Sequence, residues 1–310
     1  MARYLDPKND LTFKRIFGEH PDLLIHFLNA VMPFEPDRHI VEIEYLPAEQ
    51  VPDNPGKKNS IVDVKCKDND QRQFIIEMQM DWDEVFMNRI VFNAGKAYVK
   101  QLKRREAYHL LQPVYTLAIL NDTFDHKTER FYHHYQIVNR ENTEEIIPGL
   151  EFVLIELEKF RSESMTDRKL ALLWLRFLRE VDESMTMLPS ELQANEYIRQ
   201  AAELCEESAY TPEELAAYEK YWDIVRTEIS IREGSRRKGV IEGEAIGLQK
   251  GEAIGLQKGE VIGLQKGEAI GLQKEREEAV LRGHRRGHSI DTIAEFTDLS
   301  PDQILKILKG

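Results

Sequence analysis

The sequence predicts an α/β protein in which a mixed β-sheet is flanked by helices and followed by a helical tail. The first 160 residues favour, in order, two helices, a strand, a hairpin of strands, a helix and three further strands. From about residue 166 the apolar residues recur at helical spacing. Residues 243–274 then repeat the segment GEAIGLQK four times, with Val261 in place of alanine in the third copy.

Length and composition are those of a soluble globular protein. The 310 residues, 42% hydrophobic and 31% charged, suffice for one core domain with an appendage or for two domains. Cys66 and Cys205 lie far apart without metal-type spacing, which favours a reducing compartment over a disulfide framework. The apolar runs are too short to span a bilayer, and MARYLDPKND contains no apolar signal region. We therefore expect a cytoplasmic protein with no membrane segment.

The net charge of −13 at first argues against a nucleic-acid partner, but the acidity is unevenly distributed. Residues 111–232 carry 13 basic and 24 acidic side chains. Residues 1–110 carry 16 basic and 18 acidic side chains, and residues 233–310 carry 13 of each. Both ends are thus nearly neutral and contain basic clusters, so contact with DNA remains compatible with the composition.

The N-terminal half contains the elements that would support a site. Residues 7–30 predict two helices, with Asp10 as a plausible N-cap of the first. Alternation predicts a strand over 40–45, and turn formers predict a loop over 51–60. The segment from 61 to 79 then predicts two strands joined by the polar turn KDNDQRQ.

This hairpin carries the residues of greatest chemical interest. Because side chains alternate along a strand, Asp63 and Lys65 share one face of the first strand, and Glu77 and Gln79 share one face of the second. A carboxylate within FIIEMQM is costly unless a metal ion or another partner compensates it. Two carboxylates and a backbone carbonyl, here that of Met78, are hard oxygen ligands that suit Mg²⁺ or Mn²⁺. Such an ion supports phosphodiester hydrolysis, although this short spacing by itself also fits an ordinary surface hairpin.

The rest of the chain is predicted to be largely helical. A helix over 83–105 ends in a basic cluster that includes Lys100 and Arg104, an arrangement that also suits the helix dipole. Strands follow over 113–122, 131–139 and 152–160. Eight glycines at four-residue intervals make the repeat either a self-associating helix or a flexible tether. The segment IAEFTDLSPDQI in the tail resembles a helix-turn-helix, with a helical cap or oligomerisation element as the alternative.

Several of these pieces together resemble a known family. DLTFKRIFG, IVDVKCKD, FIIEMQ, a helix with Arg89, Tyr98 and Gln101, PVYTLAIL and FVLIELEKF occur in this order over about residues 4–160. In this the chain resembles the Rpn family of recombination-promoting nucleases, also described as transposases of the PD-(D/E)XK nuclease superfamily. The resemblance implies a restriction-endonuclease-like fold over 1–160, and we divide the remainder into a helical region (161–232), the repeat (233–274) and the helix-turn-helix-like end (275–310).

The resemblance also implies roles for individual residues. It places the two metal-binding acids at Asp63 and Glu77, and it places Gln79 where the superfamily commonly has a lysine. Glutamine can hydrogen-bond a water but carries no charge, so Lys65 is a candidate for the missing cation, against the alternative of a solvated strand lysine. Asp10 is a candidate auxiliary acid or a helix cap. Further candidates, for phosphate contact or for stabilising the site, are Arg89, Gln101, Lys100 and Arg104.

The expected function is a Mg²⁺-dependent (or Mn²⁺-dependent) DNA endonuclease that acts in recombination, transposition or defence against foreign DNA. The alternative is a catalytically inactive DNA-binding or self-associating protein that retains the fold, because the common lysine is absent at Gln79. The expected partners are DNA and, through the repeat and tail, a second copy of the chain.

Overall fold

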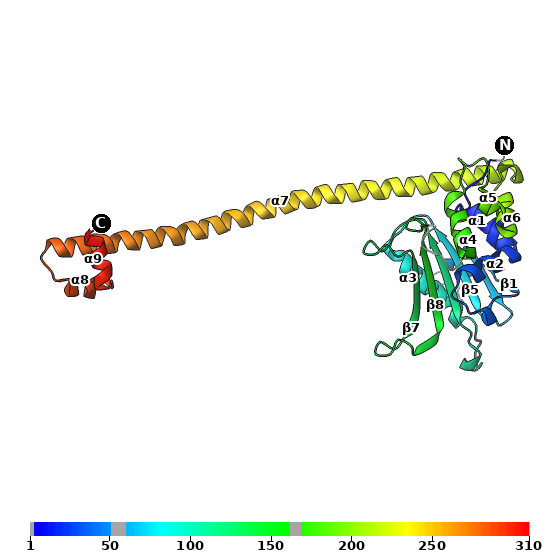
Figure 1. The fold of residues 1–310 in the computed structure, drawn as a ribbon, viewed down its shortest axis with the longest axis horizontal. Coiled ribbons are helices and arrows are strands. Elements are labelled where there is room, and N and C mark those ends of the chain that lie inside the picture. The colour runs from blue at the N-terminus through cyan, green and yellow to red at the C-terminus, as the bar shows by residue number, and fades with distance from the viewer. Residues whose placement is uncertain (1–2, 51–59, 162–168, 310) are drawn as a thin grey trace. The chain divides into compact units, whose positions relative to one another are not determined.

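The computed structural model describes residues 3–50, 60–161 and 169–309, so the predicted loop at 51–60 lies almost entirely outside the described residues. The chain divides into two compact units, residues 1–230 and 231–310 (Figure 1). Helix α7 (Pro212–Arg285) begins in the first unit and ends in the second. It runs across the predicted boundaries at 232 and 274, and the predicted four-part division stays a prediction.

The first unit is built on a six-stranded mixed sheet, which confirms the predicted fold class. Its spatial strand order is β1-β4-β5-β6-β8-β7. In that order the strands are Ile43–Tyr45, Val64–Asp68, Gln73–Gln79, Val114–Leu120, Ile146–Glu156 and Tyr132–Val138. Strands β5, β6 and β8 are parallel to one another, and the other neighbours pair antiparallel. The short strands β2 (Glu49–Gln50) and β3 (Ser60–Ile61) pair separately.

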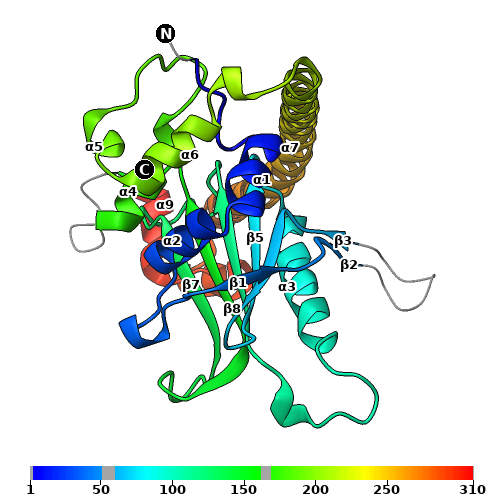
Figure 2. The same cartoon turned by 90° about the vertical axis from the view of Figure 1, so that its right-hand side faces the viewer.

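Helices cover both faces of this sheet (Figure 2). One face packs on α1 (Asp10–Glu19), α2 (Pro21–Val31), α4 (Lys169–Glu180) and α6 (Glu196–Leu204), with the short α5 (Ser190–Gln193) beside them. The other face packs on α3 (Glu84–Val99). Every residue of β6, the sequence VYTLAIL, is therefore buried, as expected for a central strand covered on both sides.

The β4–β5 hairpin holds its register through its turn. The Asp68 side chain accepts hydrogen bonds from the backbone N–H groups of Asp70 and Arg72, at 3.0 and 2.9 Å. Gln71 adopts a left-handed φ of 62°, which reverses the chain. Arg72 Nε also donates to Asp68 Oδ2 at 2.6 Å, so the charge of this buried carboxylate is paired. The predicted hairpin is confirmed, with β4 beginning only at Val64.

Two predicted details of the helices are wrong. The N-cap of α1 is Asn9, whose side chain accepts from the Leu11 N–H, whereas Asp10 is the first helical residue. An amide suits this position because the same side chain donates to the Tyr218 carbonyl, which a carboxylate would not do. Helix α3 ends at Val99 instead of 105, with Lys100 as its C-cap. Arg104 therefore lies in the turn that follows.

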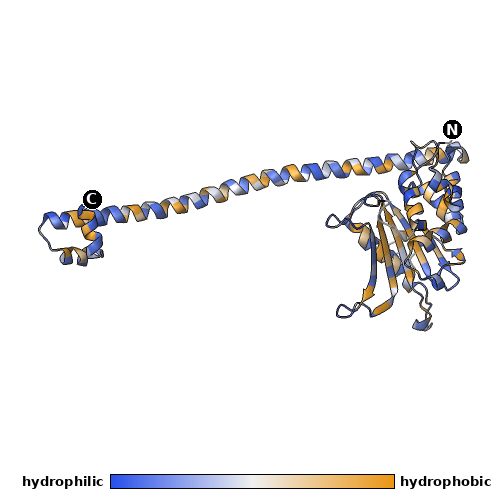
Figure 3. Ribbon diagram, in the orientation of Figure 1, coloured by the Kyte–Doolittle hydropathy of each residue, from blue (hydrophilic) through white to orange (hydrophobic). Residues whose placement is uncertain are grey.

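The repeat is helical throughout, as part of α7, and its side chains are exposed. Hydrophobic and hydrophilic residues alternate along this stretch (Figure 3). Because the repeat has eight residues and a helical turn has 3.6, successive copies of a given residue are rotated around the helix and form no single apolar face. Within the described residues, no helix combines the length and the apolar character needed to cross a membrane.

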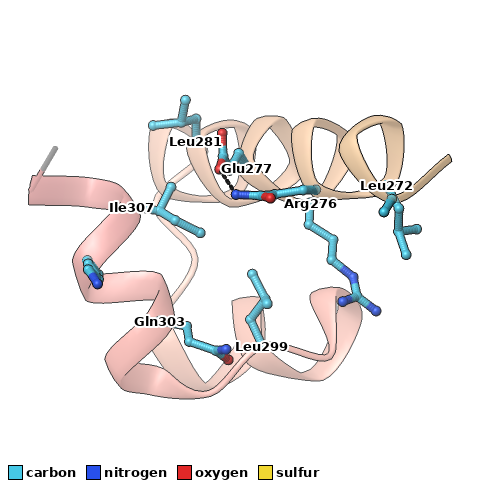
Figure 4. A pocket seen from close by; sticks show the side chains of 10 residues that line it. Leu272, Arg276, Glu277, Leu281, Leu299, Gln303 and Ile307 are labelled. Carbon is cyan, nitrogen blue, oxygen red and sulfur yellow. Dashed lines mark hydrogen bonds between the residues drawn. The ribbon is translucent and has the colours of Figure 1, made fainter. Parts of the chain in front are cut away.

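The second unit ends in two short helices packed on the last turns of α7. Helix α8 (Ile290–Thr297) is capped by Ser289, and α9 (Pro301–Lys309) begins at a proline. Ser300 and Gln303 satisfy each other's backbone N–H groups in a capping box. A small core joins the three helices through Val280, Ile293 and Ile304. Beside this core, the end of α7 and α9 enclose a pocket of about 820 Å³ (Figure 4).

Candidate active site

The candidate site forms where β4 stops and β5 continues. The last antiparallel pair of the two strands is Val64 with Ile76, so the next pair outward would be Asp63 with Glu77. Asp63 instead lies in a bend before β4, and its Oδ2 accepts the Met78 N–H at 2.7 Å. The carboxylate thus takes the place of a strand neighbour, which fixes Asp63 beside the backbone of β5.

The backbone carbonyl of Met78 points to the same side of β5 as its N–H group, which is the side of Asp63. The N–H and C=O of one strand residue point toward the same neighbouring strand. The Gln79 carbonyl accepts from the Asn121 N–H on the β6 side at 2.9 Å, and the Met78 N–H points to the opposite side, toward Asp63. The Met78 carbonyl is therefore directed to the edge where Asp63 lies, beyond the end of the β4 ladder.

The Glu77 side chain points toward helix α3 and is only 5% exposed. Its Oε1 accepts a hydrogen bond from Asn93 Nδ2 of α3 at 2.9 Å. Burial raises the pKa of Glu77, and the Asn93 hydrogen bond and the nearby Arg89 charge oppose that rise only in part. Asn93 is a functional candidate that the sequence analysis missed. The available signal was an amide on an otherwise apolar helix face with Ile90 and Ala94.

The ionised form of Asp63 is disfavoured by its surroundings, as is that of Glu77. Burial raises the pKa of Asp63 to about 7, although the hydrogen bond from Met78 lowers it. The charges of Glu77 and Asp10 raise it further, and Lys14 lowers it. A divalent ion would stabilise the partly buried Asp63 and the buried Glu77, whose charge acts on Asp63, so the donor set fits such an ion.

The oxygen donors available here are few. Among the described residues, no group of three or more histidine, cysteine, aspartate or glutamate side chains could hold a metal. The donors that could hold a divalent ion at this place are the carboxylates of Asp63 and Glu77 and the Met78 carbonyl, which are hard oxygen ligands.

Gln79 and Arg89 lie together next to these acids. Gln79 Oε1 accepts from Arg89 Nη2, and Gln79 Nε2 donates to the Asp81 carbonyl at 2.8 Å. Lys65 is buried on β4, and its pKa is lowered by burial and then by the charge of Lys100. The charge of Lys65 thus interacts with the end of α3.

The remaining candidates lie at the ends of helices. The Gln101 side chain connects the segment after α3 to the residues before β6. Its Nε2 donates to the Gln112 carbonyl and its Oε1 accepts from the Gln112 N–H, both at 2.9 Å. Arg104 is exposed in the following turn. At the start of α1, Asp10 Oδ1 forms an ion pair with Lys14 Nζ at 2.7 Å.

Helix α7 supplies a neighbour that the sequence analysis missed. Burial raises the pKa of Tyr221, and the charges of Asp10 and Asp63 raise it further. One turn earlier, the Tyr218 hydroxyl accepts the Asp6 N–H at 2.9 Å, which anchors α7 beside the start of α1. In the sequence Tyr221 belongs to an ordinary helical stripe, and no local signal distinguishes it.

Comparison with known proteins identifies the family of the chain. No curated protein and no solved structure is significantly similar to the chain. The family described as PD-(D/E)XK nuclease family transposase matches residues 7–231, which include the whole sheet and all the candidate residues above. Because this match covers more than half of the 310 residues, the chain belongs to the PD-(D/E)XK nuclease family transposases.

Proposed function

We propose that this protein is a metal-dependent DNA endonuclease that hydrolyses phosphodiester bonds with Mg²⁺ or Mn²⁺. The observation that carries the proposal is that Asp63 Oδ2 accepts the Met78 N–H at 2.7 Å while the charge of the buried Glu77, on the preceding residue of β5, acts on Asp63. Membership of a nuclease family supports the reaction class. The transposase description supports a role in transposition or recombination, and defence against foreign DNA and a cytoplasmic location are further parts of the proposal.

The chain's own residues have distinct tasks in this proposal. Asp63 and Glu77 hold the ion, and the Met78 N–H fixes the carboxylate of Asp63. Asn93 orients the carboxylate of Glu77. The bound ion would lower the pKa of a water molecule and neutralise charge on the phosphate. Asp10 is proposed as an auxiliary acid, because its charge acts on Asp63.

Plasmid nicking tests the proposal directly. Supercoiled plasmid is incubated with the full chain and Mg²⁺ or Mn²⁺, with and without EDTA. We expect Asp63→Ala and Glu77→Ala each to abolish metal-dependent nicking, because each removes one of two carboxylate ligands. The control Glu141→Ala changes an exposed acid in the β7–β8 turn and should retain the wild-type rate. Nicking that survives both site substitutions would refute the proposed site.

The second candidate function is a catalytically inactive DNA-binding protein, favoured by the neutral Gln79 where a lysine is common. The candidate DNA contacts are Arg89, Gln101, Lys100 and Arg104. An inactive protein would bind DNA with the same strong salt dependence but would not nick it with any divalent ion. Metal-dependent nicking by the wild type, lost in Asp63→Ala, excludes this candidate.

We also propose that the repeat pairs with the repeat of a second copy. Isoleucine and leucine are exposed at eight-residue intervals, from Ile246 and Leu248 to Ile270 and Leu272. The eight glycines cost about 1 kcal/mol each relative to alanine, which an isolated helix would not offset. The apolar residues form no single stripe, but the glycine at every fourth position lets two helices approach closely. The exposed isoleucines and leucines near such an approach, and the one glutamate and one lysine of each copy, can then contact the partner repeat.

Light scattering on the full chain tests this pairing. We expect the wild type to have at least twice the mass of one chain. Replacing the four repeat isoleucines by glutamine should give a single-chain mass, because it removes the apolar contacts. Replacing the four repeat lysines by arginine, which keeps charge and helix propensity, is the matched control. A wild-type mass of one chain at all concentrations would exclude the pairing.

A further inference from the structure

The site lacks a lysine at position 79, but a cation is held there by other means. Gln79 Oε1 accepts from the guanidinium of Arg89, which comes from the second turn of α3. The other end of the same amide donates to the Asp81 carbonyl at 2.8 Å. Because both ends of the Gln79 side chain are bonded, its oxygen stays directed at Arg89.

Two further contacts define where the Arg89 charge lies. Its guanidinium carbon is 4.9 Å from the ring centroid of Phe86, a side chain only 1% exposed. The charge also acts on the neighbouring Glu77 carboxylate. Arg89 is thus placed by one amide, one buried ring and one acid, while its side chain remains exposed to solvent.

We propose that Arg89 supplies, at the scissile phosphate, the positive charge that a lysine at position 79 commonly supplies in this superfamily. Gln79 is then the positioning residue that holds Arg89. A guanidinium has five N–H donors in a planar fork, so the bond to Gln79 leaves donors that match two phosphate oxygens. This inference rests on the proposed nuclease function and identifies one of its phosphate contacts.

Arg89 fits this role better than Lys65. Lys65 is buried on β4, and the charge that acts on it is that of Lys100 at the end of α3. Arg89 is exposed, adjoins Glu77 and is bonded to the residue at the lysine position.

An exchange of the cation between the two positions tests the inference in the nicking assay. We expect Arg89→Ala to lower kcat by about 100-fold, as for loss of one group that stabilises transition-state charge. Adding Gln79→Lys to Arg89→Ala should restore at least about a tenth of the wild-type kcat, because the lysine returns to its usual place. Arg140→Ala changes an exposed arginine near the β7–β8 turn and is the matched control. A kcat of Arg89→Ala within twofold of wild type would overturn the inference.

DNA binding provides a second readout that does not depend on activity. In an Asp63→Asn background, binding of a short duplex is measured between about 50 and 200 mM salt in Ca²⁺. Loss of one phosphate contact should reduce the slope of log K against log salt by about 1 in Arg89→Ala and leave it unchanged in Arg140→Ala. An unchanged slope in Arg89→Ala overturns the inference even if nicking depends on Asp63. If the wild type never nicks DNA, the nuclease proposal fails and a reduced slope still supports the phosphate contact.

Discussion

Asn93 offers the sharpest test of how the site is supported, because its main polar contact is with a proposed metal ligand. The side chain is fully buried, and its Nδ2 donates to Glu77 Oε1 at 2.9 Å. Its own Oδ1 has no hydrogen-bond partner among the described residues. Asn93→Ala therefore removes one hydrogen bond, the one that orients Glu77.

Two independent estimates of the effect agree. A hydrogen bond to a charged group contributes about 1.5–3 kcal/mol to the stability of the arrangement that contains it. Loss of a residue that orients a metal ligand typically lowers metal affinity about 10–100-fold, which corresponds to about 1.4–2.7 kcal/mol. We therefore expect Asn93→Ala to bind Mn²⁺ about 10–100-fold more weakly than the wild type and to need correspondingly more Mg²⁺ for half-maximal nicking.

Calorimetric titration with Mn²⁺ measures this directly, and circular dichroism confirms that the variant is folded. Thr116→Val is the matched control, because Thr116 is also buried and its hydroxyl has no hydrogen-bond partner among the described residues. It should bind Mn²⁺ as the wild type does. If folded Asn93→Ala also binds Mn²⁺ with wild-type affinity, Asn93 is only a core residue and the proposed support of Glu77 is wrong.

Two further predictions concern stability. Burial raises the pKa of Glu156, but hydrogen bonds, foremost that from Lys159, outweigh burial and leave it below its ordinary value. The ionised Glu156 therefore stabilises the fold at pH values above about 4.3, and this stabilisation is lost as the pH falls through its lowered pKa. In urea unfolding, Glu156→Gln should have a lower free energy of unfolding than the wild type at neutral pH, and the difference should shrink on acidification. A Cβ at Gly283 would lie 2.9 Å from Phe296 Cζ, so Gly283→Ala should destabilise α8 by about 1–3 kcal/mol in hydrogen exchange. Gly239→Ala meets no atom within 4 Å and should instead stabilise its helix by about 0.5–1 kcal/mol; equal effects of the two alanines would contradict the packing argument.

The fold could be predicted largely because its signals are local. The alternation of FIIEMQ and the polar turn before it specify a hairpin, and an uninterrupted apolar strand such as VYTLAIL specifies a position inside the sheet. The position of Asp63, one residue beyond the last pair, Val64 with Ile76, follows from the hairpin register, which the turn at Asp68 fixes. Spacing alone left Asp63 and Glu77 ambiguous, and the family resemblance made them a candidate site.

The remaining features depend on partners far away in the chain. Asn9 and Asp10 are both good capping residues, and the choice between them follows from the Tyr218 carbonyl, 209 residues away, which needs a donor. Asn93 is 16 residues from Glu77 on a helix whose buried face is otherwise apolar. Such contacts exist only after the sheet and α3 have packed, so no local pattern reveals them.

The neutral residue at position 79 takes on a different meaning once Arg89 is considered with it. An amide oxygen can accept from a guanidinium, whereas a lysine at the same place would set two positive charges side by side. Gln79 and Arg89 are thus compatible as a pair, and a lysine at 79 would be compatible only without Arg89. If Arg89 supplies the cation as proposed, the absence of the common lysine no longer favours an inactive protein, because the cation and the group that holds it lie on two elements, β5 and α3, which meet at Glu77.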